Sequence, residues 1–388
     1  DLIKSIIKYS AIIIISTFAS LYVFEYYLVS DFKNHDLKKR IRTFEKKTNK
    51  KYDVRNKITA YKELKSQDPL LSNTVTPKTY ALFPDKKIMP LSGKSNSETI
   101  VCNENGYYSI FKSDRYGFNN PDKEWDQNEV EYFLTGDSFA FGACVNRPHD
   151  FSSVLRNLSG KSVLTLGYPS NGPLIEYAVL REYFDSRVKN VLWIYYDGND
   201  LNDLELTSKT KILNNYILDK NFKQNLKDKQ SEIDKLNKGR VEAAIAYLDG
   251  RKKKNKILRF IRLDKTKNFL KKIINPPNEL KSSKEVLEKF KKILNMSKKL
   301  VEDSGANFYF IYLPSYSSLT EENLHKNRHQ RKEVLSIVSK LDINLIDIKK
   351  IILEKKINYL KLFPCEVCHY TVDGYKLIAN MIYEKTLK

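Results

Sequence analysis

The feature that most constrains the fold is an alternation of apolar and helix-forming segments from Glu129 to the end of the chain. The expected strands read "EYFLT", "SVLTLG", "NVLWIYYD", "NFYFIYL" and "INLIDI", and a helix-forming segment follows each of them. Such alternation is typical of a mostly parallel sheet with helices on both faces. We therefore expect an α/β fold for residues 129–388, with sites in the loops at the carboxyl ends of the strands.

One stretch, at about residues 204–281, breaks this alternation. It is rich in Lys and Asn, and its only apolar patches are weak. We expect a helical insertion at one edge of the sheet, serving as a lid or a membrane-facing flap. Ahead of the alternating region, turn signals between short segments predict a small β-rich extension at residues 75–128. Residues 31–74 have the character of a charged, helix-prone stalk.

The N-terminus carries an uncharged segment, "YSAIIIISTFASLYVF" from Tyr9 to Phe24, and its apolar character continues to Val29. As a helix, this segment spans about 30 Å, which matches the hydrocarbon core of a bilayer. A cleaved signal peptide and a buried helix are the alternatives. The apolar run is longer than a usual signal core, however, and no small-x-small cleavage site follows it. Residues 1–30 are therefore predicted to form a single transmembrane anchor.

The charge and the cysteines bear on the partners and on the side of the membrane. A net charge of +21 would ordinarily suggest nucleic acid or an anionic surface. The lysines are scattered and no nucleic-acid-binding motif is present, so we expect no nucleic-acid partner. A basic run at residues 38–51 would keep the large domain in the cytoplasm by the positive-inside rule.

The four cysteines favour the opposite side. Disulfides pairing Cys102 with Cys144 and Cys365 with Cys368 would require an oxidising compartment. Free buried thiols are the alternative, and the Cys365–Cys368 spacing also fits half of a zinc site, for which no second half is present. We expect the catalytic domain on the periplasmic or extracytoplasmic side, with neither a metal nor a cofactor.

Polar residues follow the predicted strands in an order that suits acyl transfer. Ser138 follows the first strand, where a helix-capping serine is the simpler alternative. A neutral serine needs a base, and the base needs an acid that holds its tautomer. His369 and Glu366, three residues before it, provide these groups ahead of the last helix. Ser170 and Asn199 follow the second and third strands, where they could reach the same point. The supporting positions are Asp137, directly before Ser138, and Gly167, Gly172 and Asp200 in these loops.

Three blocks, "GDSFAFG", "YYDGNDLND" and "EVCHYTVDGYKLIA", resemble the signature blocks of the SGNH hydrolases, the GDSL-type esterase and lipase superfamily. The resemblance covers residues 129–388 without the insertion, and it implies a flavodoxin-like three-layer α/β/α sandwich. It places the nucleophile at Ser138, an oxyanion-hole asparagine at Asn199 and the base at His369. This sequence departs from the family at Glu366, where an aspartate is usual, and at Ser170, where a glycine usually offers its N–H.

These observations predict a membrane-anchored serine esterase that removes acyl groups, above all O-acetyl groups, from a glycan or a lipid. The N–H groups of Ser138 and Ser170 and the amide of Asn199 would hold the oxyanion. Two alternatives keep the same fold. One is an O-acetyltransferase of surface polysaccharide assembly, and the other is a catalytically silent glycan-binding module.

Overall fold

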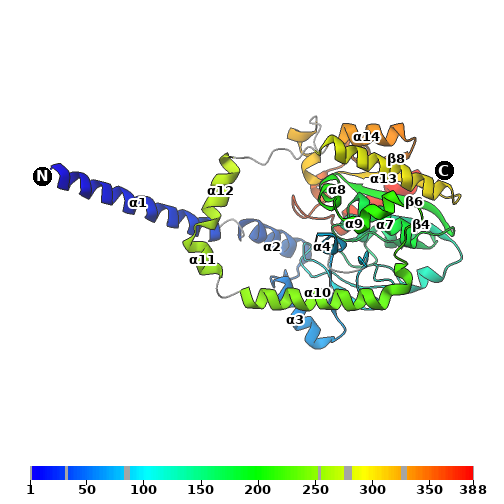
Figure 1. Ribbon diagram of the computed structural model, residues 1–388, viewed down its shortest axis with the longest axis horizontal. Helices are drawn as coiled ribbons and strands as arrows, with labels where there is room; N and C mark the ends of the chain where they lie inside the picture. Colours follow the sequence, from blue (N-terminus) through cyan, green and yellow to red (C-terminus); the bar gives the residue numbers. More distant parts are fainter. Residues whose placement is uncertain are drawn as a thin grey trace. The chain divides into compact units, whose positions relative to one another are not determined.

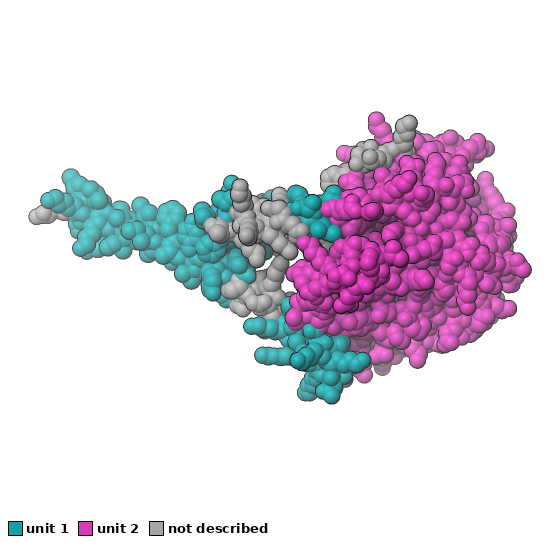
Figure 2. Space-filling view, turned by 90° about the horizontal axis from the view of Figure 1, so that it is seen from below, with its two compact units in different colours: residues 1–52, 243–279 teal, residues 53–242, 280–388 magenta. Residues whose placement is uncertain are grey.

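The computed structural model describes residues 2–30, 34–82, 88–251, 255–274, 282–324 and 330–387. The chain divides into two compact units, which Figure 2 colours separately. The first unit comprises residues 1–52 and 243–279, and the second comprises residues 53–242 and 280–388. The second unit contains the two β-sheets that the structure describes.

A five-stranded parallel sheet forms the centre of the second unit (Figure 1). The strand order is β5 (Val163–Thr165), β4 (Val130–Gly136), β6 (Val188–Tyr196), β7 (Asn307–Leu313) and β8 (Asn344–Asp347), and every neighbouring pair is parallel. The five strands coincide with the five apolar segments of the sequence. They are apolar along most of their length because helices cover both faces of the sheet. The predicted α/β fold with a mostly parallel sheet is confirmed.

The two faces of the sheet bury different layers of side chains. On one face, Leu134 and Leu192 belong to a core that includes Phe151 of α6 and Ile378 of α16. On the other face, Tyr195 packs against Phe290 of α13. The helices of this unit outside the insertion are α3 (Lys57–Gln67), α4 (Pro77–Leu82), α5 (Ser138–Phe141), α6 (Phe151–Ser159), α7 (Pro173–Tyr183), α13 (Lys284–Glu302), α14 (Arg331–Lys340), α15 (Ile348–Glu354) and α16 (Val372–Thr386).

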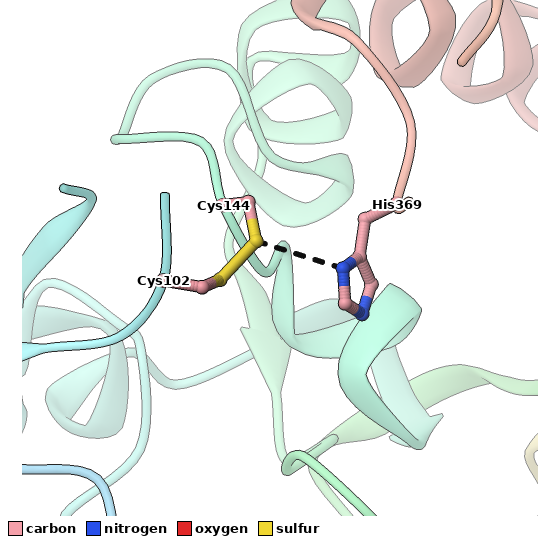
Figure 3. A group of neighbouring side chains, drawn as sticks. All are labelled: Cys102, Cys144 and His369. Carbon is pink, nitrogen blue, oxygen red and sulfur yellow. Dashed lines mark hydrogen bonds between the residues drawn. A yellow bond between two sulfur atoms is a disulfide. The ribbon is translucent and has the colours of Figure 1, made fainter. Parts of the chain in front are cut away.

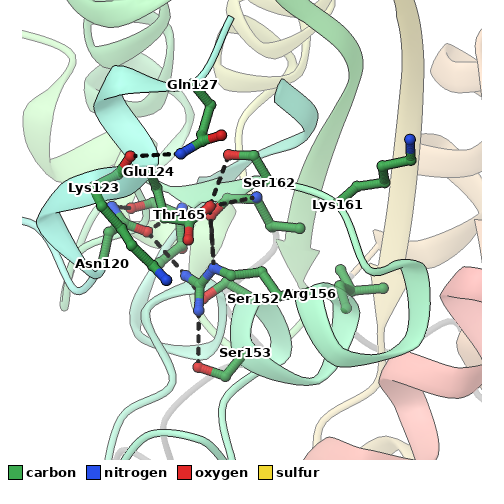
Figure 4. A network of polar contacts seen from close by, with 12 residues as sticks. Asn120, Lys123, Glu124, Gln127, Ser152, Ser153, Arg156, Lys161, Ser162 and Thr165 are labelled. Carbon is green, nitrogen blue, oxygen red and sulfur yellow. Dashed lines mark hydrogen bonds and ion pairs between the residues drawn. The ribbon is translucent and has the colours of Figure 1, made fainter. Parts of the chain in front are cut away.

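The segment before the main sheet forms a second, three-stranded sheet of β1 (Ser72–Asn73), β2 (Glu98–Ile100) and β3 (Ile110–Lys112). A polar network ties this extension to α6 and β5 (Figure 4). Arg156 of α6 donates to the hydroxyls of Ser152 at 3.0 Å and Ser153 at 3.1 Å, and its Nε lies 3.9 Å from Glu124 Oε2. Glu124 in turn accepts from the hydroxyl of Ser162, next to β5, at 2.7 Å. Because Glu124 and Arg156 are largely removed from water, this network fixes the extension on the main domain.

The insertion is mostly helical where the structure describes it. Its helices are α8 (Asp200–Thr207), α9 (Lys211–Leu218), α10 (Gln230–Arg251), α11 (Asn255–Ile261) and α12 (Asp264–Ile274). The first part is fixed to α7, since the Glu182 carboxylate accepts from the Tyr216 hydroxyl at 2.6 Å and from the N–H of Leu226 at 3.0 Å. The predicted insertion is thus shared between the two units, and its residues 252–254 and 275–281 lie outside the described residues.

The first unit begins with α1 (Leu2–Ser30) and α2 (Asn34–Thr48). In the described part of the chain, α1 alone is long and apolar enough to cross a membrane, over Leu2–Val29, and its most apolar window is unburied. A signal sequence at the N-terminus would satisfy the same criteria of length and composition.

Candidate active site

Ser138 stands where β4 ends and the short helix α5 begins. The preceding Gly136 has a φ of +156°, and a Cβ there would lie 2.7 Å from the carbonyl oxygen of Ile194. Asp137 caps α5, since its carboxylate accepts the N–H of Phe139 at 2.8 Å. The glycine allows the close approach to β6, and the cap sets the turn. Together they hold a half-buried Ser138 just after the carboxyl end of β4, next to the central strand β6.

The Ser138 hydroxyl meets the imidazole of His369, which lies in the segment before α16. Ser138 Oγ is 2.8 Å from His369 Nε2. The imidazole also packs against Phe139, with ring centroids 4.9 Å apart. The O–N distance lies within the range for direct proton transfer. The structure therefore brings together the predicted nucleophile and the predicted base.

The second ring nitrogen of His369 faces the carboxylate of Glu104, in the extension. His369 Nδ1 is 3.1 Å from each carboxylate oxygen, and the backbone N–H of His369 donates to Glu104 Oε2 at 2.6 Å. These contacts orient both the ring and its backbone. A proton on Nδ1 that is donated to Glu104 leaves Nε2 as the acceptor for the Ser138 hydroxyl.

The prediction that Glu366 orients the imidazole is wrong. Its side chain is exposed, and the described carboxylate partner of His369 is Glu104. The physical reason is the Cys365–Cys368 disulfide, which closes a tight turn with the N–H of Cys368 donating to the carbonyl of Cys365 at 3.2 Å. Residues between the two ends of such a turn point to solvent, and the neighbouring Val367 is 91% exposed.

A second disulfide, Cys102–Cys144, joins the segment that carries Glu104 to the segment that carries Ser138. Figure 3 shows this disulfide beside the His369 ring, with Cys144 Sγ 3.6 Å from Nδ1. The amide of Asn105 adds a hydrogen bond to the carbonyl of Cys144 at 3.1 Å. Since the two sulfurs are bonded to each other, they are not the thiolates that a zinc ion would bind.

The charges around the imidazole favour its protonated form. Burial lowers the pKa of His369, but the hydrogen bond and charge of Glu104 and the charge of Asp137 outweigh burial and raise it. Burial raises the pKa of Asp137 to about 6, although hydrogen bonds from Phe139 and Asn199 and the charge of His369 lower it. An imidazole that gains a proton easily is suited to act as a general base toward a serine hydroxyl.

The loop after β5 lies beside Ser138, because β5 is a direct neighbour of β4 in the sheet. The N–H of Tyr168 donates to the carbonyl of Gly136 at 3.2 Å. Two residues later, Ser170 adopts a left-handed φ of 65° in a turn that the N–H of Asn171 closes on Tyr168 at 3.1 Å. In the described residues no acceptor is assigned to the backbone N–H of Ser138 or of Ser170.

The loop after β6 flanks the other side of β4 and holds Asn199, the N-cap residue of α8. Its Nδ2 donates to Asp203 Oδ2 at 2.8 Å, and Asp203 pairs with Lys78 of α4 at 2.7 Å. The adjacent Asp200 accepts the N–H of Tyr196 at 2.9 Å, so this carboxyl closes the loop back on its own strand. The hydrogen bond to Asp203 thus fixes the orientation of the Asn199 side chain.

The two supporting glycines allow close packing of these loops. A Cβ at Gly167 would lie 2.5 Å from the Cβ of Ala140 in α5, and one at Gly172 would lie 2.7 Å from the Cβ of Asp203. Neither glycine could therefore be replaced without displacing the segments that hold Ser138 or Asn199.

Two residues of the site were missed by the sequence reasoning, and both come from the extension. Glu104 contacts His369, and Lys78 pairs with Asp203 behind Asn199. A signal for Glu104 was present, because it lies two residues after Cys102 and the expected partner Cys144 lies six residues after Ser138. Lys78 had no comparable signal.

No protein-family model and no curated protein matches the chain. It is similar to a solved protein assigned to the G-D-S-L lipolytic family from Desulfitobacterium hafniense, at 15% identity and a TM-score of 0.37, over 66% of this chain and 99% of that one. A G-D-S-L lipolytic protein from Veillonella parvula aligns at 11% identity and a TM-score of 0.35, over 66% and 97% of the two chains. An acetyl xylan esterase aligns at 9% identity and a TM-score of 0.36, over 66% and 100%. At such identities and TM-scores, these similarities do not identify the reaction or the substrate of this chain.

Proposed function

We propose that the chain is a membrane-anchored serine esterase that cleaves carboxylic esters, with O-acetyl esters of a glycan as its substrates. The observation that carries this proposal is the continuous line of contacts from Ser138 Oγ through His369 to the carboxylate of Glu104, at 2.8 Å and 3.1 Å. A catalytically silent module has no need of this alignment. The triad of the proposal is therefore Ser138, His369 and Glu104.

The proposed reaction begins when Ser138 Oγ attacks the ester carbonyl carbon and its proton passes to His369 Nε2. Glu104 stabilises the imidazolium that forms, because its charge lies against Nδ1. Collapse of the tetrahedral intermediate breaks the bond to the alcohol oxygen, which takes the proton from Nε2. Water then attacks the acyl-serine by the same route and releases the acid.

The oxyanion of the intermediate requires donors on the far side of the carbonyl. In the proposal these are the backbone N–H groups of Ser138 and Ser170, neither of which has an assigned acceptor among the described residues. The Asn199 amide is the third donor. It would turn one hydrogen from Asp137 toward the substrate as negative charge develops, while Asp203 holds the other at 2.8 Å.

The proposed anchor is α1, and the proposed location of the catalytic domain is outside the cytoplasm. Support comes from the apolar length of α1 and from the pairing of all four cysteines, since disulfides persist in oxidising compartments. The basic residues of α2 argue for the opposite side by the positive-inside rule. The side of the membrane is tested by introducing one surface cysteine into the catalytic domain and treating intact cells with a membrane-impermeant thiol reagent. Failure of the reagent to label this cysteine would contradict the proposed location.

The activity is tested with the purified full chain, a fluorophosphonate probe and aryl esters of increasing acyl length. We expect Ser138-dependent labelling and a preference for acetyl over long-chain esters. Labelling and turnover that survive Ser138→Ala would remove the proposed function. A preference for long-chain esters would replace the glycan by a lipid, and turnover that rises with added oligosaccharide and yields acylated sugar would identify a transferase.

A further inference from the structure

Within the first unit, α11 and α12 pack against the carboxyl-terminal end of α1. The side chains of α1 are exposed up to Ser20, and contacts with the insertion begin at the next turn. The hydroxyl of Tyr22 donates to the carbonyl of Ile261 at 3.0 Å. Phe24 meets Phe269 of α12 edge to face, with ring centroids 5.3 Å apart. The end of α1 is therefore part of a small folded body.

A buried carboxylate fixes this contact. Glu25 of α1 is 1% exposed and accepts the N–H of Lys265 at 3.0 Å, the N–H of Thr266 at 2.7 Å and the hydroxyl of Thr266 at 2.8 Å. The two N–H groups lie in the first turn of α12, where a helix leaves its amides without internal partners. Loss of α1 as a cleaved signal would break these three hydrogen bonds and the contact of Phe24 with Phe269. The packing thus favours an α1 that is retained in the mature chain.

The rest of α11 and α12 combines exposed apolar and basic side chains. In α12 the apolar residues recur every three to four positions, which places them on one face of the helix. Ile273 and Ile274 are 61% and 73% exposed. The exposed basic residues of the two helices and of the turn between them include Arg262, Lys265, Lys267 and Lys271. Helices of this composition lie in the boundary between lipid headgroups and acyl chains.

The position of this body along α1 agrees with the thickness of a bilayer. Lys8 and Glu25 lie 17 positions apart, which is about 25 Å along a helix and close to the hydrocarbon thickness. An apolar segment bounded by these two charges puts Glu25, and with it the start of α12, at the interface. The carboxylate is tolerated there because α12 donates three hydrogen bonds to it.

We propose that α11 and α12 lie in the headgroup region of the bilayer that α1 crosses, with their exposed apolar side chains in the acyl boundary and their basic side chains against anionic lipid phosphates. We call α11 and α12, a part of the insertion that belongs to the first unit, the collar of the anchor. This inference rests on α1 as the proposed anchor and is independent of the esterase activity.

The test uses the full chain in vesicles of phosphatidylcholine and phosphatidylglycerol. All four native cysteines are paired, so one introduced cysteine gives one labelling site. Ile273→Cys reports on the apolar face, and Asn268→Cys on the polar face of the same helix is the matched control. An environment-sensitive fluorophore should emit at shorter wavelength at residue 273, be quenched by a lipid nitroxide and be protected from aqueous iodide. At residue 268 it should be open to iodide.

Three results would overturn the inference. Iodide quenching at residue 273 equal to that at residue 268 would show that the apolar face is in water. Protection at residue 273 from both iodide and the lipid nitroxide would show that protein, such as a second copy of the chain, covers it. Unchanged protection in vesicles of phosphatidylcholine alone would remove anionic lipid as the partner.

A label at Ile13→Cys, 63% exposed in the middle of α1, separates this failure from that of the anchor. Quenching by deep lipid nitroxides at residue 13 together with iodide access at residue 273 would contradict the proposed collar and leave the proposed anchor intact. Iodide access at residue 13 would defeat the anchor itself.

Discussion

Replacement of Glu104 by Gln should remove nearly all activity although the side chain keeps its shape. The backbone N–H of His369, 2.6 Å from the carboxylate, is a fixed donor and will take the single amide oxygen. The amide NH₂ then faces His369 Nδ1, which must become an acceptor. The ring proton moves to Nε2, where it blocks proton transfer from Ser138. A wrong tautomer of this kind costs about 10³–10⁴ in kcat, or about 4–5.5 kcal/mol of transition-state stabilisation.

The assay is the initial rate of aryl acetate hydrolysis, with thermal unfolding as a check on the fold. Glu366→Gln is the matched control, because Glu366 is exposed and is close to His369 only in sequence. The hydrolysis rate of Glu366→Gln should stay within about twofold of the parent's rate, because exposed charges contribute little. Activity retained in Glu104→Gln and lost in Glu366→Gln would refute the reasoning.

The pH profile gives an independent measurement of the same contact. The base must be neutral to accept a proton, so activity falls as the pH drops through the pKa of His369, which Glu104 raises. Without the carboxylate this pKa falls, and the acid limb of the residual activity in Glu104→Gln should move to lower pH. An acid limb that stays in place would show that Glu104 does not act on the imidazole.

Three further substitutions test the surroundings of the site. Burial and the charges of Asp137 and Asp203 raise the pKa of Glu176, in α7, well above its usual value, so the parent loses stability as the pH rises from the usual pKa to the raised one. In urea titrations, Glu176→Gln should therefore have the same free energy of unfolding as the parent near pH 4 and a larger one at about pH 8. Equal free energies at both pH values would contradict this. Arg156→Met leaves the buried carboxylate of Glu124 without its cation and should lower the free energy of unfolding by about 3 kcal/mol in the same titration. An unchanged urea midpoint would show that the network is dispensable. Gly136→Ala places a Cβ 2.7 Å from a carbonyl oxygen and should cost about 2 kcal/mol with loss of fluorophosphonate labelling, whereas normal labelling would show that the turn can relax.

The sequence predicted the sheet well, because buried parallel strands are nearly continuous apolar segments and the chain separates them with helix-forming ones. The contact between Ser138 and His369 could be predicted for a related reason. Each lies next to a regular element whose position the parallel topology dictates, so local pattern was enough to place both at one edge of the sheet.

The carboxylate partner of His369 was misplaced because its position depends on a contact between distant segments. Glu104 belongs to an extension whose short strands give no period that points to the main sheet. Proximity in sequence favoured Glu366, but the Cys365–Cys368 turn directs that side chain to solvent. A protein shortened to residues 129–388 would keep the predicted domain and lose both Glu104 and Lys78.

The Cys102–Cys144 disulfide links the placement of Glu104 to the redox state of the compartment in which the chain folds. Folding of the sheet is enough to bring Ser138 and His369 together, whereas the segment that carries Glu104 is secured by a bond that needs an oxidant. A newly made chain in a reducing cytoplasm would lack this bond, so that Glu104 would be held less firmly against His369. On the proposed function, such a precursor would spare acylated molecules inside the cell, and export would complete the enzyme. Full activity after reduction of this disulfide would rule out such latency.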